Sequence, residues 1–293
     1  MDNRHFGYKH KLANVGLLYT AAIWGSTFFV VKDTLAEVNP LALVGYRFSI
    51  AGLVLLVWLL LRRKPVLRDL KRGLVLALIL APVFLSQTIG LQYTTASNSG
   101  FITGLFVAFV PLFQRTLFKT KPSVMEVVAS GVSLVGLWIL TGGLADMNIG
   151  DGLTLVTAAT AALHLLACDR FMKTGSDPVT LSCQQFLMVG LLSFVLALAT
   201  GRPMSFGTPE AGLVLLFLAL FPTLSAFVIQ LLSQTIVTPM RVSLIFALEP
   251  AFAALFAWTL GGEVVVVRRA LGGLLIFAAL LLSGLRWPIR RNG

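Results

Sequence analysis

Long apolar stretches recur along this chain of 293 residues, and they constrain its fold more than any other feature. A helix crosses the hydrocarbon core of a bilayer with about 20 predominantly apolar residues. Ten stretches approach that length: 13–31, 41–61, 73–91, 97–118, 124–140, 152–168, 180–199, 211–232, 240–260 and 270–285. Inside lipid every backbone polar group needs an internal partner, so such stretches form helices. The sequence therefore predicts an all-α membrane protein with ten transmembrane helices.

The scarcity of charged residues agrees with a membrane protein. Only 12% of the residues are charged and 57% are hydrophobic, whereas a soluble domain has about 25% charged and 45–50% apolar residues. This composition argues against a soluble domain, a disordered chain and a disulfide scaffold. Cys168 and Cys183 lie in or beside apolar stretches, which favours buried thiols over a disulfide. The connecting loops are too short for a second domain, so residues 1–293 are expected to form one membrane domain.

The distribution of basic residues predicts the orientation. With the N-terminus inside, 18 of the 23 lysines and arginines fall on the inner side, and Arg47 falls within a span. The four on the outer side are Lys32, Arg202, Arg268 and Arg269. Cytoplasmic loops carry such an excess, so both termini are expected in the cytoplasm, and the chain is expected in a bacterial-type inner membrane as a multi-pass protein. The net charge of +11 then reflects topology and suits contact with anionic lipid, and nucleic acid is not an expected partner.

The first apolar stretch begins shortly after Arg4, Lys9 and Lys11, as the apolar region of a signal peptide would. It is long for such a region, and no clear A-x-A cleavage site follows it. We therefore interpret it as an uncleaved first helix.

Proline spacing indicates an internal repeat. Pro40 precedes Pro111 by 71 residues, and Pro178 precedes Pro250 by 72 residues. The alternative is chance spacing in a chain rich in leucine and alanine. A repeat would divide the chain into halves of about 1–143 and 150–293.

Each half would contain five helices, and an odd number forces the second half to enter the membrane inverted. The charges agree, because the loop after the second span carries six basic residues and the loop after the seventh carries one. Inverted repeats are typical of secondary transporters, in which two related halves move around a central site. The predicted fold is thus two inverted five-helix repeats, N-in and C-in.

Short motifs follow one another in order along the chain. They are Trp24-Gly25-Ser26, the stretch from Gly90 to Phe101 that leads to Pro111, Leu248-Glu249-Pro250-Ala251-Phe252, Gly262-Glu263 and Leu271-Gly272-Gly273. Their order and spacing resemble the drug/metabolite transporter superfamily in its ten-helix EamA-type form, and within it the aromatic amino-acid exporter (YddG-type) branch. The resemblance implies an exporter of small metabolites. The second half has Ala162-Leu163-His164 where the first has Trp24-Gly25-Ser26, which predicts an asymmetric site.

Three ionisable residues lie clearly within the spans, where charge is costly and often functional: Arg47, His164 and Glu249. Glu249 lies roughly 9 residues into its span, or about 13 Å along a helix, near the bilayer midplane. It is either a substrate-ammonium or proton site or a structural carboxylate. Arg47 lies roughly 9 Å from the outer face, where a structural or gating role is favoured over binding of a substrate carboxylate. His164 either contacts substrate or relays protons, or it is a neutral side chain bonded to another helix.

Uncharged polar and aromatic side chains extend the set of candidate cavity residues. They are Ser26, Gln87, Tyr93, Asn98, Gln185 and Gln230, with interhelical hydrogen bonding as the alternative role. Trp24 lies in the middle of the first span and would line a cavity or stack on a substrate, or else pack against helices or lipid.

Prolines and glycines supply candidate gating residues. Pro111 and Pro250 each remove a donor and free a carbonyl one turn earlier, at Val107 and Phe246, so they predict either gating kinks beside a cavity or simple curvature. Gly100 and Gly104 have the spacing that allows close helix packing.

These features predict a secondary transporter that exports small organic metabolites, most specifically apolar or aromatic amino acids, by alternating access through a central cavity. The alternatives are other metabolites or organic cations on the same scaffold, a channel, or an intramembrane enzyme. No Walker P-loop, H-E-x-x-H or G-x-S-x-G motif occurs, and no cluster of metal ligands is evident, so no catalytic residue, cofactor or metal is predicted. Ten helices can form a closed bundle, so a monomer is compatible with the sequence.

Overall fold

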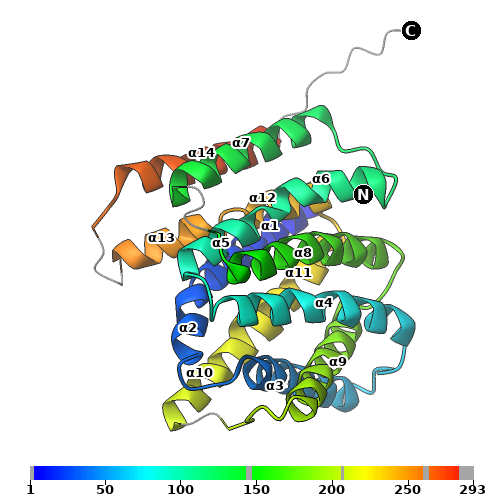
Figure 1. Ribbon diagram of the computed structural model, residues 1–293. Coiled ribbons are helices and arrows are strands. Elements are labelled where there is room, and N and C mark those ends of the chain that lie inside the picture. Colours follow the sequence, from blue (N-terminus) through cyan, green and yellow to red (C-terminus); the bar gives the residue numbers. More distant parts are fainter. Residues whose placement is uncertain (1–2, 143–146, 206–207, 260–263, 284–293) are drawn as a thin grey trace.

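The computed structural model describes residues 3–142, 147–205, 208–259 and 264–283, and every regular element in them is a helix (Figure 1). The first half contains α1 (Asn3–Gly25), α2 (Thr27–Thr34), α3 (Pro40–Leu61), α4 (Leu70–Gly90), α5 (Ala96–Gly104), α6 (Phe106–Thr116) and α7 (Val124–Thr141). The second half contains α8 (Ile149–Lys173), α9 (Pro178–Ala199), α10 (Pro209–Ala219), the π-helical turn η1 (Leu220–Ser225), α11 (Ala226–Gln234), α12 (Pro239–Phe246), α13 (Glu249–Thr259) and α14 (Val267–Ser283). The predicted all-α class is confirmed.

Eight helical segments of the described chain are long and apolar enough to cross a membrane. The other two predicted spans are α5 with α6, which breaks at Leu105, and α14, which has 17 residues. The ten-helix count therefore stays a prediction. Residues 262 and 263, the ends of the last two predicted spans and the C-terminal basic residues lie outside the described residues.

The outward faces of the helices are apolar. On α3, for example, Leu53, Val57 and Leu60 are exposed, and Leu61 is 78% exposed. A soluble protein that exposed such continuous apolar surface would aggregate. In lipid the same faces are solvated by acyl chains, so the fold is that of a multi-pass membrane protein.

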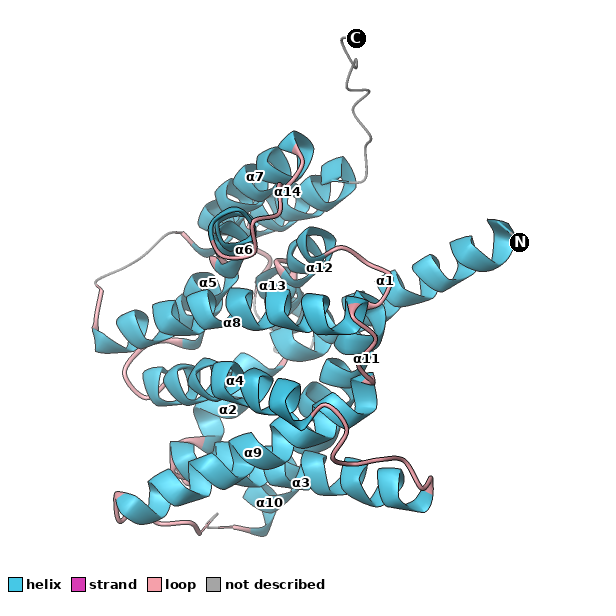
Figure 2. Cartoon of the chain, turned by 90° about the vertical axis from the view of Figure 1, so that its right-hand side faces the viewer, coloured by secondary structure: helices cyan, strands magenta, loops and turns pink. Residues whose placement is uncertain are grey.

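The long helices pack as a bundle with α7 and α14 at one edge and α3, α9 and α10 at the opposite edge (Figures 1 and 2). α3 packs against α9, α7 against α14, and α4 against α8. α3 and α9 also begin alike: Asn39 and Asp177 cap them, and Pro40 and Pro178 occupy the first turn, where a missing N–H costs nothing. Helices that would be counterparts in a repeat therefore begin alike and pack together.

Several of the predicted spans contain a break between two helices. Not every break falls at a proline. Pro250 is the second residue of α13 and follows the break between α12 and α13. Pro111 lies inside α6, and the break in that span falls at Leu105 instead. The carbonyl that Pro111 frees at Val107 accepts a hydrogen bond from Ser130 Oγ of α7 at 2.8 Å. That bond satisfies the carbonyl, and the helix continues.

The contact between α7 and α14 is made backbone to backbone. A Cβ atom on Gly272 would lie 2.4 Å from the Leu140 nitrogen and 2.6 Å from the Gly136 oxygen. Real Cβ atoms do not approach backbone that closely, so the contact requires glycine at this position.

We expect Gly272→Ala to lower the unfolding temperature of the purified protein in detergent, because overpacking of this kind costs about 1–3 kcal/mol. Gly131→Ala on α7 is the control, because a Cβ there meets no atom within 4 Å, and it should leave the temperature unchanged. Equal unfolding temperatures for the two variants would contradict the packing described for α7 and α14.

Candidate functional site

A central cavity lies between the two halves of the chain. It encloses about 850 Å³ of space, part of it open to the surroundings, within the range of ligand-binding pockets. Its lining comes from α1, α2, α3, α4, α5 and α6 of the first half and from α8, α11, α12 and α13 of the second. Six residues singled out from the sequence meet here: Trp24, Arg47, Gln87, His164, Gln230 and Glu249.

Aromatic rings form much of the cavity wall. The Trp24 ring centroid lies 5.2 Å from that of Phe227 and 4.8 Å from that of Phe246. The Phe84 centroid lies 5.8 Å from that of Phe227. These tilted and edge-to-face contacts hold the rings in place as a rigid apolar surface.

Arg47 of α3 is a buried cation at the cavity wall, with an exposed fraction of 4%. Its Nε donates a hydrogen bond to Thr223 Oγ1 of η1, and its guanidinium carbon lies 4.8 Å from the Phe84 ring centroid. Within the described residues its two terminal nitrogens have no hydrogen-bond partner, and no carboxylate forms an ion pair with it. A buried charge without a partner is costly, so Arg47 suits an anionic group inside the cavity.

Glu249 is the first residue of α13 and has an exposed fraction of 6%. The helix N-terminus favours a carboxylate at this position. The described part of the chain supplies no hydrogen bond and no ion pair to its side chain, which lines the cavity. Gly25 lets α1 pass close to this helix start, because a Cβ on Gly25 would lie 2.5 Å from the Glu249 carbonyl oxygen. The Trp24-Gly25-Ser26 motif thus places a cavity tryptophan beside the point where Glu249 begins its helix.

His164 lines the cavity from α8 and is 3% exposed. Its Nε2 lies 2.8 Å from Gln185 Oε1 of α9, and Cys168 Sγ lies 3.6 Å from the same nitrogen. Gln185 therefore sits behind the imidazole and orients it. No group of three or more His, Cys, Asp or Glu side chains suited to a metal ion occurs among the residues described.

The two cavity glutamines are tied to neighbouring side chains. Gln87 Nε2 of α4 donates to Thr103 Oγ1 of α5 at 3.1 Å. Gln230 Nε2 of α11 contacts Gln234 Oε1 at 3.3 Å. Gln87 thereby links two helices at the cavity wall, in agreement with the interhelical alternative for this residue.

Four residues predicted for the cavity do not line it. Ser26 sits at the break between α1 and α2, where its hydroxyl donates to the Ile23 carbonyl of α1 at 2.7 Å. Tyr93 is 58% exposed in the turn after α4, and Asn98 lies in the first turn of α5, where its N–H donates to the helix cap. Gln185 contacts the cavity only through His164. The sequence shows which residues are polar and how far each lies along its predicted span. It does not show which of them point toward the cavity.

The predicted gating residues divide between two environments. Pro250 and Gly100 line a second cavity of about 660 Å³, and Phe28 borders both this cavity and the central one. Gly104 instead packs against α7, since a Cβ there would lie 2.8 Å from Leu137 Cδ2. Gly104 therefore serves a close helix contact, whereas Gly100 is buried beside the second cavity.

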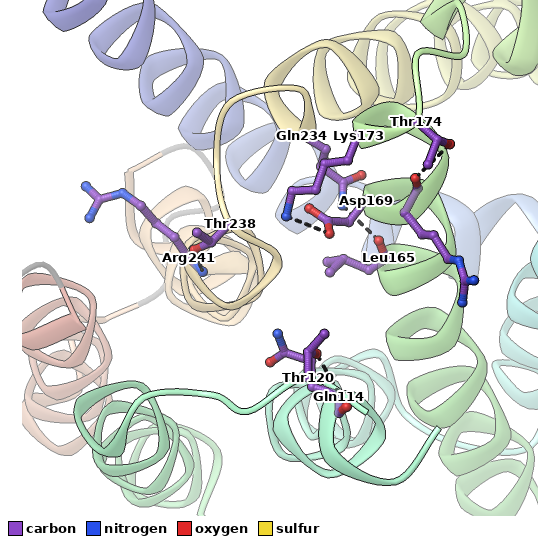
Figure 3. A network of polar contacts seen from close by, with 10 residues as sticks. Gln114, Thr120, Leu165, Asp169, Lys173, Thr174, Gln234, Thr238 and Arg241 are labelled. Atoms are coloured by element: carbon purple, nitrogen blue, oxygen red, sulfur yellow. Dashed lines mark hydrogen bonds and ion pairs between the residues drawn. The ribbon is translucent and has the colours of Figure 1, made fainter. Parts of the chain in front are cut away.

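A polar cluster adjoins the central cavity at the ends of α6, α8, α11 and α12 (Figure 3). Gln234 Nε2 donates to the carbonyl of Leu165, a cavity residue, at 2.8 Å. Further along α8, Lys173 Nζ and Asp169 Oδ2 form an ion pair at 2.8 Å. The cavity lining does not include the side chains of Gln234, Lys173 or Asp169.

Several lining or supporting residues were missed by sequence analysis. They are Phe84, Phe227 and Phe246 in the wall, and Thr223 behind Arg47. The phenylalanines give no signal in a chain with 21 of them. Pro222-Thr223 within an apolar stretch is the one sequence signal that would have pointed to η1.

We expect a cysteine at position 161 to react with a small charged methanethiosulfonate reagent, because Ala161 borders the central cavity. The background is C168S/C183S, which removes the two buried free thiols. Ala162→Cys is the matched control, since Ala162 is fully buried and does not line the cavity. Labelling at position 161 no faster than at position 162 would contradict the placement of Ala161 at a water-accessible cavity.

Comparison with known proteins agrees with this architecture. The model of the EamA-like transporter family matches residues 11–142 and again residues 148–285. An uncharacterized transporter of Archaeoglobus fulgidus is 32% identical over 96% of this chain and 88% of its own length. The uncharacterized inner membrane transporter YedA of Escherichia coli K12 is 27% identical over 89% of this chain and 87% of its own length.

A solved crystal structure shares the fold with a TM-score of 0.77 at 19% identity, covering 92% of this chain and 96% of the other. At that identity the likeness concerns the fold alone. The family model, which accounts for most of the chain in two matches, together with the relatives, identifies the molecule: this chain belongs to the EamA-like transporter family and is a multi-pass membrane transporter.

Proposed function

We propose that this transporter is a secondary exporter of amino acids with apolar or aromatic side chains, working by alternating access through the central cavity. The observation that carries the proposal is the presence of Arg47 and Glu249 in one aromatic cavity, with no ion-pair partner among the described residues for either. The proposal places the protein with the aromatic amino-acid exporters of its superfamily.

An α-amino acid matches both unpaired charges. Its carboxylate would accept hydrogen bonds from the terminal nitrogens of Arg47, a geometry that guanidinium groups favour. Its ammonium would lie against the Glu249 carboxylate. A zwitterion bound in this way neutralises both residues in a low-dielectric site, where unpaired charges are most costly.

The aromatic wall supports an apolar side chain on the substrate. Trp24, Phe84, Phe227 and Phe246 offer ring faces and edges to a bound aromatic or aliphatic group. Sugar phosphates fit less well, because Arg47 is the one lysine or arginine among the lining residues described. The small number of polar anchors in a mostly apolar cavity is typical of sites for such ligands.

Two observations that the halves of the chain are related support alternating access. The family model matches the chain twice, and α3 packs against its proposed counterpart α9. Breaks in helices around a cavity are typical of transporters built from inverted repeats. In the proposed arrangement ten helices form two inverted five-helix repeats, both termini are cytoplasmic, and the polar cluster of Figure 3 lies on the cytoplasmic side. One chain would form a complete transport unit.

A second candidate substrate class is organic cations. Glu249 beside an aromatic wall also suits a cation without a carboxylate, because ring faces attract positive charge. Under this alternative Arg47 has no substrate partner and is a structural cation.

Counterflow with the purified protein in liposomes tests the proposal. Vesicles are preloaded with one unlabelled amino acid at a time, and the entry of labelled phenylalanine, methionine or threonine is followed with and without a pH gradient. Saturable counterflow of phenylalanine is expected. Counterflow of tetraethylammonium in its place would favour the organic-cation alternative, and no counterflow by a folded protein would overturn the amino-acid proposal.

We expect Glu249→Gln to raise the apparent KM for phenylalanine by about tenfold or more, because the variant loses a charge-assisted bond to the substrate ammonium. Glu210→Gln is the control, since Glu210 is exposed at the start of α10 and does not line the cavity. Near-normal flux of Glu249→Gln at normal expression would remove Glu249 from the binding site.

We expect Trp24→Ala to reduce flux of phenylalanine more than flux of threonine, because the indole ring contributes to the aromatic wall. Both substrates are measured on the same vesicles, so the ratio of the two fluxes is independent of protein amount. An equal loss for both would mean that Trp24 supports the scaffold, through its hydrogen bond to Pro222, and not the substrate.

A further inference from the structure

A π-helical turn interrupts the longest apolar segment of the second half. η1 spans Leu220–Ser225 between α10 and α11 and contains Pro222. Because Pro222 has no N–H, the Leu218 carbonyl one turn earlier loses its usual partner. Thr223 replaces that partner, since its hydroxyl donates to the Leu218 oxygen at 2.7 Å. Turns of this type are rare and occur frequently at functional sites.

Because the Thr223 hydroxyl donates its proton to the Leu218 carbonyl, Thr223 Oγ1 can act only as an acceptor toward Arg47. Its single hydroxyl proton is used on the Leu218 oxygen, so the lone pairs of Oγ1 are left for Arg47 Nε, which donates to them. Thr223 is fully buried. Thr223 thus links a carbonyl freed by proline to the cavity cation.

The adjacent residue of the same turn supports the other recognition side chain. Trp24 Nε1 donates to the Pro222 carbonyl at 2.6 Å. Two further bonds join the next turns to α1, between Tyr19 and Ser225 at 2.8 Å and from Thr20 to the Ala226 carbonyl at 3.4 Å. η1 is therefore anchored along α1, and it holds both Trp24 and Arg47 from behind the cavity wall.

Arg47 is held in two ways that leave one edge free. Phe84 lies under the guanidinium face at 4.8 Å, and Thr223 holds Nε. These two contacts restrict the rotation of the guanidinium group of Arg47, which lines the cavity and whose two terminal nitrogens have no partner among the described residues. Two parallel N–H donors in a fixed plane match the two oxygens of a carboxylate.

We propose that Thr223 is a positioning residue for substrate selectivity: by holding Arg47 Nε it presents the paired terminal nitrogens to a substrate carboxylate, so that the π-helical turn determines which substrates are accepted. The inference rests on the proposed function, because it deepens the carboxylate role given there to Arg47. Thr223 itself does not touch the substrate.

The test compares phenylalanine with phenylalaninamide, which keeps the ring and the ammonium but lacks the carboxylate. Each competes with labelled phenylalanine in counterflow into liposomes. We expect the wild type to prefer the acid. Thr223→Val should weaken competition by the acid about tenfold and leave competition by the amide unchanged, with maximal flux near that of the wild type. Thr223→Ser keeps the hydroxyl and should retain the wild-type preference.

Thr223→Val also leaves the Leu218 carbonyl without its partner, so its folding is checked by thermal unfolding. Where it does not fold, Thr223→Cys takes its place, because a thiol is a weak donor and acceptor of similar size. A preference for the acid that stays at the wild-type value in the folded variant overturns the inference. So does a loss of preference in Thr223→Ser equal to that in Thr223→Val.

Arg47→Gln separates this inference from the proposed function. If Arg47→Gln abolishes the preference for the acid while Thr223→Val keeps it, the carboxylate role of Arg47 stands and the role of Thr223 is wrong. If Arg47→Gln also keeps the preference, Arg47 does not bind the carboxylate and both proposals lose their basis.

Discussion

The structure depends on one constraint: a carbonyl released inside the membrane must find a donor within the protein, because lipid offers none. Helix breaks and prolines release such carbonyls. Here side chains supply the donors. Ser130 of α7 bonds Val107 of α6, and Trp24 of α1 bonds Pro222 of η1, whereas Thr223 bonds Leu218 of the preceding turn in its own segment. Two of these bonds meet at η1, directly behind the cavity. Irregular backbone is therefore found where side chains are available to satisfy it, and those side chains also shape the cavity.

The charged side chains in the same cavity, unlike the backbone carbonyls, have no ionic partner in the described part of the protein. The backbone is satisfied internally, whereas Arg47 and Glu249 have no ionic partner among the residues described. A transporter that paired these two residues with each other would hold a neutral, closed site with little reason to bind a zwitterion. Under the proposed function, a doubly charged, net-neutral substrate that contacts both residues would reduce the cost of burying them.

The sequence predicted the parts of this molecule that depend on local chemistry. Hydrophobic length located the eight segments that are long and apolar enough to cross a membrane. Charge inside apolar stretches identified Arg47, His164 and Glu249 as candidates. The sequence did not predict which side chains point into the cavity. Tyr93 and Asn98 are as polar as Gln87, yet of these three only Gln87 lines the cavity. The sequence also did not predict the break at Leu105 or the phenylalanine wall, whose rings come from helices distant in sequence.

The two halves of the chain differ in sequence at one corresponding motif, and this difference has a structural consequence. Where the first half has Trp24-Gly25-Ser26, the chain breaks between α1 and α2, and Gly25 brings α1 against the start of α13. Where the second half has Ala162-Leu163-His164, α8 runs unbroken and His164 is held by Gln185 of α9. A scaffold of two related halves would offer two equivalent half-sites. The glycine and tryptophan on one side and the histidine on the other make them different, and such an asymmetric site suits the amino-acid substrate proposed above, whose ammonium and carboxylate also differ.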